Sequence, residues 1–449
     1  MSVLRIGAGA GFSGDRIAPA VELAEKGNLD FLVFECLAER TIALAQHARL
    51  KDPASGFDPM LERRMRAVLP ITARNGTRIV SNMGAANPQA AARLVRKVAH
   101  DLGLHDLKIA AVTGDDVLDV IGPCQLDETG STAAAMGKRL ISANAYIGIA
   151  PIVAALDAGA DVVICGRASD PALFLAPLVH HFGWSMDDWT RLGRGTLVGH
   201  LLECSAQVTG GYFADPGVKD VPNLARVGFP LAEVDEDGNA VITKVAGTGG
   251  CVTRATCTEQ LLYEIHDPES YLQPDVVADF SKVMIEQIGP DRVAVSGADG
   301  RAATGRLKIS VGYRDGWKAD GQISYAGANC VARARLAAEL VQQRLEDAGI
   351  DLIESRADLI GYDSVPRPVA SRQAAPPHEV RLRFVARCKT PEIAHLVVDE
   401  VEGLYLCGPA GGGGVTRNVG EIIAIASTLM PAKNVRTSFE MLETQDAVA

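Results

Sequence analysis

Short apolar runs alternate with amphipathic stretches through the first half of the chain. Strands are predicted at VLRIGA near the start and over 30–36, 77–83, 108–114 and 160–168, where apolar and β-branched residues cluster. Helices are predicted between them, over 15–26, 37–50, 59–75, 88–102, 131–142 and 150–158, and from Pro171 onward. Strands that are largely apolar and alternate with helices are typical of a parallel sheet covered on both faces.

The pattern changes after about residue 225. Asp-Gly pairs at 237–238 and 315–316 each stand between apolar stretches, and this arrangement predicts antiparallel hairpins. A helix is predicted over 331–348, where apolar positions recur at helical spacing. Residues 364–378 are rich in proline and small residues and predict a linker or exposed crossover. Beyond them, EVRLRFVARC, PEIAHLVVDEV and GLYLCG predict a strand, a helix and a strand.

These patterns predict an α/β protein of several domains. Residues 1–225 are expected to form a mostly parallel sheet with helices on both faces, and 226–363 an antiparallel α+β region. Residues 364–378 are then the linker, and 379–449 a small α+β domain. A chain of 449 residues is too long for one ordinary core, which agrees with this division.

Composition narrows the possible classes. Acidic residues outnumber basic ones by 55 to 44, a net charge of -11, whereas a general nucleic-acid-binding protein needs a basic face. No apolar run of about 20 residues predicts a membrane span, and the first residues reach glycine before the apolar region of a signal peptide forms. We therefore expect no nucleic-acid or membrane partner, a cytoplasmic location and, on general grounds, a homo-oligomer.

The nine cysteines are dispersed along the chain, and none belongs to a C-x-x-C pair. Paired cysteines at that spacing are typical of zinc sites and redox dithiols, so the sequence predicts neither. We assign no metal site.

The first candidate site is the loop GAGAGFSG between the first strand and the first helix. Gly9, Gly11 and Gly14 have the spacing of a dinucleotide-binding loop, and Glu35 closes the next strand at about the expected distance. Glycines there let backbone N–H groups approach an anion at a helix N-terminus. The loop predicts a bound nucleotide, another anion, or only a tight turn.

The second candidate is SNMGAANP, after the third strand. Asn82 and Gly84 fall where ligands bind in open parallel sheets, beyond the carboxyl ends of the strands. Asn87 and Pro88 equally suit the start of a helix, so an ordinary turn with Asn87 as the N-cap stays open.

Two more strands end in charged residues. Asp115 and Asp116 follow 108–114 and predict a cation site, an acid–base pair or a solvated turn. Arg167 follows 160–168 and offers a bidentate fork to a carboxylate or phosphate. Asp170 is expected either to orient Arg167 or to cap the helix that starts at Pro171.

A helix face with His200 and Glu203 is the last candidate in the first domain, and Gly210 and Gly211 end that helix. An imidazole beside a carboxylate suits proton transfer or a metal, although a structural ion pair has the same spacing. Near the other end of the chain, the glycine run at 411–414 predicts close approach of the backbone to a ligand or another domain, or a flexible lid.

The chain contains, in this order, GAGAGFSGDR at 7–16, MRAVLP at 65–70, SNMGAANP at 81–88, GRASDPALFLAPLVHHFGW at 166–184, GHLLECSAQVTGGYFADPG at 199–217 and LARVGFPLAEV at 224–234. Their order and length resemble the acyclic terpene utilisation (AtuA-like) family over approximately 1–360. The resemblance implies that 226–363 completes the family's domain and that the last domain is a small ferredoxin-like unit. It also implies catabolism of branched acyclic terpenoids or other carboxylic acids, often as coenzyme A thioesters.

Our leading hypothesis is an enzyme of carboxylic-acid or acyl-CoA catabolism, a lyase or hydratase that works by proton transfer. Glu203, His200 and Asp170 are the predicted catalytic residues. Arg167 would bind a carboxylate or phosphate, and Asn82 with backbone N–H groups would stabilise an enolate-like oxygen. We assign no resident cofactor, but a coenzyme A thioester is a candidate substrate. An NAD(P)-dependent oxidoreductase and a non-catalytic subunit of a degradation complex are the alternatives.

All of these assignments assume that loops from the carboxyl edge of the first sheet converge on one anion-receptive crevice. The predicted substrate-binding residues are Gly9, Gly11, Gly14, Glu35, Asn82, Gly84, Asp115, Arg167, Gly210 and Gly211.

Overall fold

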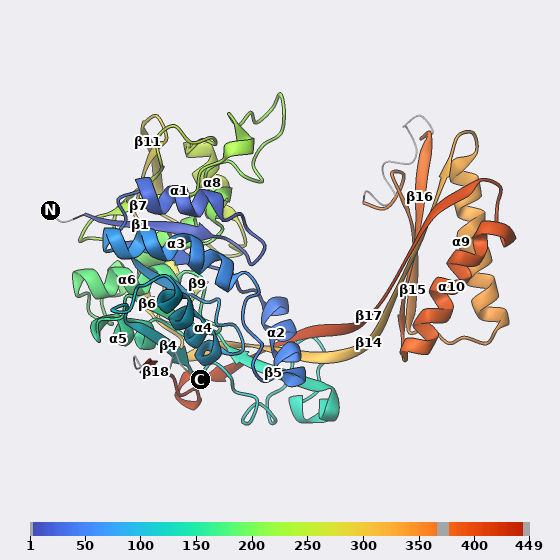
Figure 1. The fold of residues 1–449 in the computed structure, drawn as a ribbon, viewed down its shortest axis with the longest axis horizontal. Coiled ribbons are helices and arrows are strands. Elements are labelled where there is room, and N and C mark those ends of the chain that lie inside the picture. The colour runs from blue at the N-terminus through green and yellow to red at the C-terminus, as the bar shows by residue number, and fades with distance from the viewer. Residues whose placement is uncertain (1–2, 366–376, 443–449) are drawn as a thin grey trace. The chain divides into compact units, whose positions relative to one another are not determined.

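The computed structural model describes residues 3–365 and 377–442, which fall into two compact units. Unit 1 consists of Met1–Gly312 and Ile425–Ala449, and unit 2 of Tyr313–Ala424. The chain leaves unit 1 within strand β14 (Arg306–Ala326) and returns to it within β17 (Gly412–Pro431), as the colours of Figure 1 allow the reader to follow.

A ten-stranded sheet runs through the described part of unit 1, and the strands at its centre are parallel. Every residue of β2 and β6 is buried, as expected for strands with helices on both faces. The parallel strands are, in spatial order, β1 (Leu4–Ala10), β2 (Phe31–Phe34), β3 (Arg78–Ser81), β6 (Val162–Cys165) and β4 (Ile109–Thr113).

Antiparallel strands extend this sheet at both edges. The predicted hairpin at 237–238 is confirmed, because β7 and β8 pair across a turn in which Gly238 has φ +82. At the opposite edge, a strand from the far end of the chain pairs with β4. The strands that residues 1–225 contribute to this sheet are parallel, as predicted, but antiparallel strands from beyond residue 225 join the same sheet, which is therefore mixed. The added strands are β7 (Pro230–Val234), β8 (Ala240–Lys244), β12 (Arg292–Ser296), β11 (Met284–Gly289) and β18 (Ser438–Met441).

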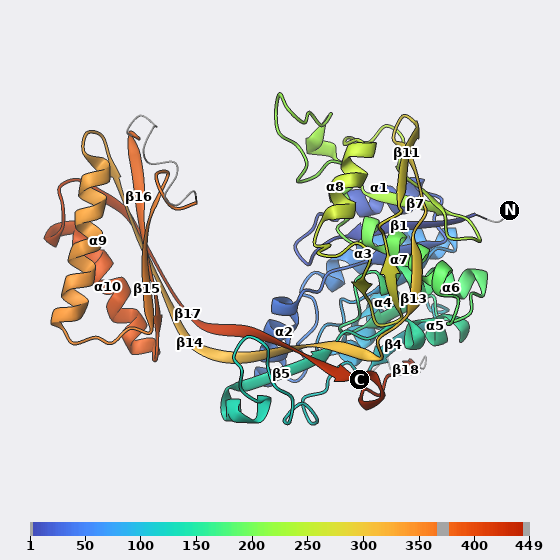
Figure 2. The same ribbon diagram turned by 180° about the vertical axis from the view of Figure 1, so that it is seen from behind.

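Helices cover both faces of the parallel strands. Helices α1, α3 and α4 pack side by side in front of the strands in Figure 1. Helices α6 and α7 cover the other face, which the view from behind in Figure 2 shows. Asn87 caps α4, since its Oδ1 accepts the N–H of Ala90 at 3.3 Å. The helices are α1 (Ala18–Lys26), α3 (Leu61–Asn75), α4 (Pro88–Asp101), α5 (Ala150–Asp157), α6 (Ala172–Phe182) and α7 (Trp189–Leu202).

Shorter elements complete unit 1. Strand β5 (Leu140–Ala145) pairs with β14, although the sequence predicts the end of a helix there. A three-stranded sheet of β13 (Asp299–Ala302), β10 (Val276–Asp279) and β9 (Tyr271–Leu272) packs on α7. The other elements are α2 (Glu39–Lys51), α8 (Arg254–Leu262) and the 3₁₀ turns η1 (Ala133–Arg139), η2 (Ser205–Gln207), η3 (Leu224–Arg226) and η5 (Ala432–Asn434).

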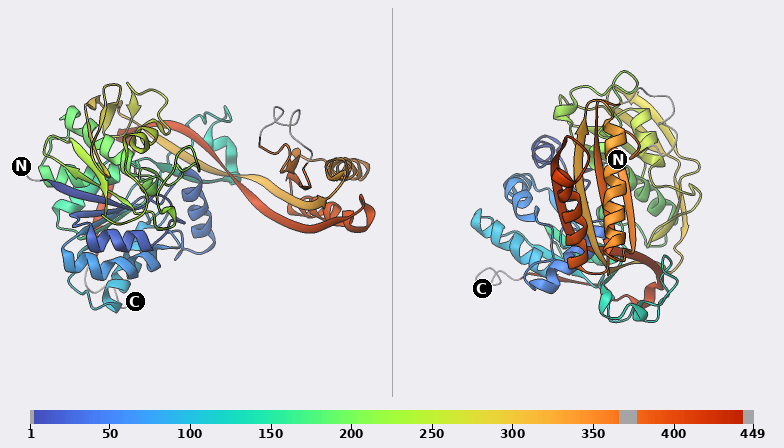
Figure 3. Two further views of the ribbon diagram at one scale, coloured as in Figure 1. Left: turned by 90° about the horizontal axis from the view of Figure 1, so that it is seen from above. Right: turned by 90° about the vertical axis from the view of Figure 1, so that its right-hand side faces the viewer.

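Unit 2 has its own sheet and its own core. Its elements follow the order β14, α9, β15, β16, α10 and β17, and the strands lie in the order β15–β16–β14–β17. Helices α9 and α10 pack side by side over the sheet (Figure 3, right). Alternate residues of β16 point at them, among them Leu382 and Phe384. The remaining bounds are α9 (Cys330–Asp347), β15 (Glu354–Ile360), β16 (Glu379–Cys388) and α10 (Pro391–Cys407).

The limits of these units differ from the predicted domains. The antiparallel region expected over 226–363 is divided at Gly312, and 379–424 share a sheet and a core with β14, α9 and β15. Residues beyond Ala424 return to unit 1. Of the predicted linker at 364–378, residues 366–376 lie outside the described residues.

Two local predictions are wrong. The Asp-Gly pair at 315–316 forms no hairpin, because β14 continues through it and pairs with β16 from Trp317 to Ala326. Gly316 takes φ +88 within the strand instead. GLYLCG at 403–408 is not a strand, since α10 extends to Cys407. In both places the contacts of unit 2 outweigh the local sequence preference.

Candidate active site

The candidate site lies at the carboxyl ends of β3 and β6, where the connections of the sheet change direction. Helix α4 leaves β3 on one face and α6 leaves β6 on the other, and open α/β sheets bind ligands at such a point. The two chains approach closely there, because a Cβ on Gly84 would lie 2.5 Å from the carbonyl oxygen of Cys165. This contact explains Gly84 by packing, and its role in binding stays a prediction.

Glu35 and Asn82, at the ends of β2 and β3, are bonded to each other. Asn82 Nδ2 donates to Glu35 Oε1 at 2.8 Å, and the N–H of Leu37 donates to the same oxygen at 2.8 Å. Asn82 Oδ1 in turn accepts the N–H of Cys36 at 2.7 Å. Because both ends of its amide bond to the protein, Asn82 is the residue that orients Glu35.

Arg167 and Asp170 form an ion pair at the end of β6. Arg167 is 1 % exposed, and its Nη1 donates to Asp170 Oδ1 at 2.8 Å and to the carbonyl oxygen of Leu37. Asp170 makes no capping hydrogen bond to α6, so of the two roles predicted for it, the structure has the orientation of Arg167. Asp170 thereby occupies the fork that the sequence assigned to a substrate carboxylate.

A tyrosine that the sequence analysis missed lies against this ion pair. The Cζ of Arg167 is 3.8 Å from the centre of the Tyr146 ring, and Lys308 Nζ is 4.9 Å from it. The Tyr146 hydroxyl donates to Glu39, which also accepts from Lys308 at 2.9 Å. Although burial opposes it, these hydrogen bonds lower the pKa of Glu39 to about 2. Tyr146 therefore stacks on the guanidinium and fixes its plane.

His200 and Glu203 meet at the end of α7, as the spacing predicts. His200 Nδ1 is 2.9 Å from Glu203 Oε1, and His200 Nε2 is 3.1 Å from the carbonyl oxygen of Leu261. Burial opposes it, but Glu203 raises the pKa of His200. Burial also raises the pKa of Glu203 to about 7, although His200 counteracts it. A hydrogen bond thus joins a buried imidazole to a buried carboxyl group at the end of α7.

The groups from β2, β6 and α7 lie close enough to act on one another. Burial first and the charge of Asp170 second raise the pKa of Glu35 well above its usual range, and the charge of Asp170 also raises that of Glu203. Desolvation raises the pKa of Asp170 itself, whereas Arg167 lowers it. Glu35 and Asp170 thus both act on Arg167, and Asp170 also acts on Glu203; we call Glu35, Asp170, Glu203 and Arg167 the carboxyl cluster.

Asp115 supports this cluster from the end of β4. Its Oδ2 accepts the N–H of Arg167 at 3.0 Å and Asn144 Nδ2 at 2.9 Å, and burial raises its pKa to about 6. Asp115 and Asn144 also line a recess of about 220 Å³ with Arg49 and the residues that follow β3 and β4. Asp116 is exposed and accepts from the amide of Gln46 at 3.3 Å.

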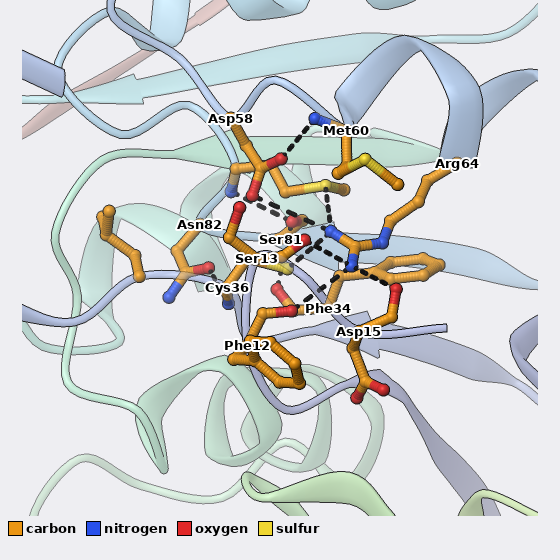
Figure 4. Close-up of polar contacts among 12 residues, drawn as sticks. Phe12, Ser13, Asp15, Phe34, Cys36, Asp58, Met60, Arg64, Ser81 and Asn82 are labelled. Carbon is orange, nitrogen blue, oxygen red and sulfur yellow. Dashed lines mark hydrogen bonds and ion pairs between the residues drawn. The ribbon is translucent and has the colours of Figure 1, made fainter. Parts of the chain in front are cut away.

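The glycine loop between β1 and α1 is held by a buried arginine (Figure 4). Arg64 Nη2 donates to the carbonyl oxygens of Phe12 at 3.3 Å, Ser13 at 2.8 Å and Asp15 at 3.1 Å. The N–H of Gly11 donates to Asp15 Oδ2 at 3.0 Å, in the place where a dinucleotide-binding loop presents free N–H groups. These contacts favour the tight turn among the three readings of the loop.

The glycines predicted to bind substrate each have a packing neighbour. A Cβ on Gly9 would meet the Phe34 ring at 2.5 Å, one on Gly11 the carbonyl carbon of Cys204 at 2.6 Å, and one on Gly14 the Phe12 ring at 2.7 Å. Gly210, with φ +99, and Gly211 turn the chain after η2. The contact of Gly11 with Cys204 brings the loop after β1 to the end of α7, beside Glu203.

The Acyclic terpene utilisation family protein AtuA model matches residues 4–441. The chain belongs to this family. The match extends through both units, and so beyond the approximately 360 residues for which the sequence analysis found a resemblance. Searches among curated proteins and solved structures gave no match. Membership in this family places the protein in the catabolic use of acyclic terpenes.

Sequence reasoning missed the residues of this AtuA family protein that complete the cluster from elsewhere in the chain. Tyr146 follows β5, Lys308 lies in β14, and Gln260, whose Nε2 donates to the carbonyl oxygen of His200 at 2.9 Å, lies in α8. None of them ends a predicted parallel strand, so the rule used to select candidates could not find them. Arg64 carried a weak sequence signal, because it is a charged residue at a position on the buried face of helix α3.

Within residues 3–365 and 377–442, no three His, Cys, Asp or Glu side chains gather as a metal site would require. Among the helices in those ranges, none combines the length and the apolar character needed to span a bilayer.

Proposed function

We propose that the protein is an acid–base enzyme that moves a proton at the carbon next to the carbonyl group of a branched carboxylic acid or its coenzyme A thioester. The carboxyl cluster is the observation that carries this proposal, because Glu35, Asp170 and Glu203 come together from three elements and all have raised pKa values. Groups that transfer protons near neutral pH are tuned in this way. The family supplies the substrate class.

Asp170 is the proposed base. Its side chain keeps 33 % of its surface accessible, more than Glu35 or Glu203, so a substrate can reach it. The ion pair with Arg167 holds its carboxylate in place, and its raised pKa makes it a stronger base than an ordinary aspartate. Arg167 and Tyr146 are then positioning residues, because they act through Asp170.

Glu35 is the proposed hydrogen-bond donor to the enolate oxygen. Burial raises the pKa of Glu35 well above the usual range and so favours the neutral carboxyl group, which can donate a proton. Asn82 and the N–H of Leu37 both bond to Oε1, which leaves Oε2 to carry the proton toward substrate. A donor aimed at the oxygen where charge develops stabilises the transition state.

The His200–Glu203 pair serves as the second acid–base group, on the α7 side of the cluster. It acts on the group that leaves or adds during the reaction, after the carbon proton has gone to Asp170. The separation of roles follows from position, since Glu203 comes from a helix end and Asp170 from a strand end.

The test uses the purified full-length chain in D₂O with 3-hydroxy-3-methylbutanoyl-CoA and its free acid as probes. We expect deuterium at C2, detected by mass spectrometry. Asp170→Asn should slow the exchange about 100-fold or more, the usual contribution of a general base, whereas Asp187→Asn, at an exposed aspartate of unit 1, should not change it. Unlabelled C2 with both probes, as expected of a non-catalytic subunit, or full-rate exchange by Asp170→Asn would refute the proposal.

The dinucleotide alternative has its own measurement. Because Asp15 and Arg64 already bond to the loop after β1, isothermal titration with NAD(H) and NADP(H) at millimolar concentration should give no binding heat. Saturable heat would favour an oxidoreductase.

We also propose that unit 2 is the ferredoxin-like domain implied by the sequence resemblance. Its order β-α-β-β-α-β is that of a ferredoxin-like fold, and both helices pack together. The domain would then occupy 313–424 instead of the expected 379–449.

A further inference from the structure

Glu203 has one carboxylate oxygen in use and one without a partner. Oε1 pairs with His200, whereas Oε2 is buried and has no hydrogen-bond partner among the described residues. A buried acceptor that lacks a donor is unfavourable, and native proteins leave few of them without a functional reason.

A second unpartnered acceptor belongs to Gln260, on α8. Its Nε2 must face the carbonyl oxygen of His200, to which it donates at 2.9 Å, so the amide oxygen Oε1 points elsewhere. That oxygen is buried and also lacks a partner in the described structure. The side chain of Gln260 also acts on the thiol of Cys204, so it lies beside the turn that carries Glu203.

Gln260 Oε1 can only accept a hydrogen bond, whereas Glu203 Oε2 accepts one when its carboxyl group is ionised and donates one when it is protonated, so the ligand needs at least one donor. A water molecule or an alcohol has O–H groups for this purpose, whereas a carboxylate or phosphate has none when ionised. An ammonium ion is disfavoured, because a charged His200 already neutralises Glu203, with its Nε2–H on the carbonyl oxygen of Leu261 and its Nδ1–H on Oε1. The ligand that fits both oxygens is therefore a hydroxyl group or water.

We propose that the reacting oxygen, as water or as the substrate's hydroxyl group, binds between Glu203 Oε2 and Gln260 Oε1, so that the enzyme is a hydratase or dehydratase of 3-hydroxy acids or their thioesters. This inference rests on the proposed function, and it selects one reaction among those that begin by proton removal. Gln260 becomes a substrate-binding residue, and His200 a positioning residue for Glu203.

The step balances without a co-reactant. In dehydration the C2 proton moves to Asp170, the electron pair of the C2–H bond forms the C2=C3 double bond, and the C3–O bond breaks. The oxygen takes the proton of the Glu203 carboxyl group and leaves as water. After dehydration, solvent returns the proton from Asp170 to Glu203, and hydration is the reverse of all these steps.

The test runs the same two probes, 3-hydroxy-3-methylbutanoyl-CoA and its free acid, in D₂O and in H₂¹⁸O. Reversible dehydration should put deuterium at C2 and ¹⁸O at the C3 hydroxyl, and should release the 3-methylbut-2-enoyl product. Deuterium without ¹⁸O would overturn this inference and leave the proposed function standing. Release of acetone, which reports cleavage of the C2–C3 bond, would also overturn it, and absence of both labels would overturn both.

Variants of Glu203 and Gln260 provide a second test of the proposed binding site. Glu203→Gln should lower ¹⁸O exchange at least 100-fold while deuterium exchange falls less, because Asp170 is intact. Gln260→Met should raise KM for the 3-hydroxy probe more than it lowers kcat, since it removes an acceptor for the hydroxyl. Gln343→Met, on the surface of α9, is the matched control and should change neither. Equal loss of both labels in Glu203→Gln would contradict the separate role of Glu203.

Discussion

Asp115 is a carboxyl group whose burial has a measurable cost. It is 4 % exposed, and burial raises its pKa from the usual 3.8 to about 6. A raised pKa in the folded state means that the protonated form is the favoured one. The contribution of Asp115 to the free energy of unfolding is fully present below pH 3.8, and it is lost as the pH rises through about 6.

Asp115→Asn should therefore remove a pH dependence. Between pH 4 and pH 6 the free energy of unfolding of the native chain should fall relative to that of the variant, by an amount on the order of 3 kcal/mol. Urea unfolding of both proteins at several pH values measures the difference. Asp119→Asn, at an exposed position nearby, is the control, and identical slopes for Asp115→Asn and the native chain would contradict the prediction.

Arg64 is the residue on which the glycine loop depends. It is fully buried, it donates to three carbonyl oxygens of the loop, and Asp58 Oδ2 lies 3.8 Å from its Nη1. Arg64→Leu should lower the free energy of unfolding by about 3 kcal/mol or more, because it leaves Asp58 buried without its cation. Arg63→Leu, one residue earlier and exposed, should change it by less than about 0.5 kcal/mol. Equal effects of the two variants in urea unfolding would show that the loop does not depend on Arg64.

At the scale of the element, helix α10 contains an avoidable glycine. Gly403 is exposed in the helix, and a Cβ there would have no neighbour within 4 Å. Gly403→Ala should raise the free energy of unfolding of unit 2 by about 0.5–1 kcal/mol, since alanine is the better helix former. Gly321→Ala, in strand β14, should lower the free energy of unfolding, because the added Cβ would lie 2.8 Å from Cγ2 of Val401 in α10. Thermal unfolding measures both, and the same sign for the two variants would contradict the packing.

The sequence predicted elements well where one local signal was enough. Apolar runs identified β1, β2, β3, β4 and β6, and Asn87 with Pro88 marked the start of α4. The prediction failed for β14, because ten successive pairs with β16 outweigh the Asp-Gly signal at 315–316. It failed for the edges of the large sheet for the same reason, since pairing of β18 with β4 joins residues more than 300 positions apart.

The candidate site was likewise predictable only where a local signal in the sequence was enough. Glu35, Asn82, Arg167 and Asp170 follow strands, so their convergence could be inferred from the parallel sheet. Their pairing could not, and neither could the raised pKa values, because these depend on burial by residues from other parts of the chain. Tyr146 is the clearest example, since its stacking on the guanidinium leaves no periodic or spacing signal.

At the scale of the whole molecule, the two units are expected to have independent stability. The core of unit 2 consists of residues from within 313–424, including Phe384, Val397 and Leu345. A fragment of these residues should unfold cooperatively, and Trp317, its sole tryptophan, reports the transition by fluorescence. A fragment that begins at Cys330, and so lacks the part of β14 in unit 2, should not fold. Gradual unfolding of the longer fragment would contradict this independence.

The pairing of β18 with β4 bears on how the protein is made. The edge of the large sheet beside Asp115 stays open until Ser438–Met441 have been synthesised, and a Cβ on Gly114 would lie 2.1 Å from the carbonyl oxygen of Arg436. Synthesis must therefore pass Met441 before this edge of the first unit can close. Until then the nascent chain exposes an unpaired strand edge, of the kind that recruits chaperones or neighbouring chains.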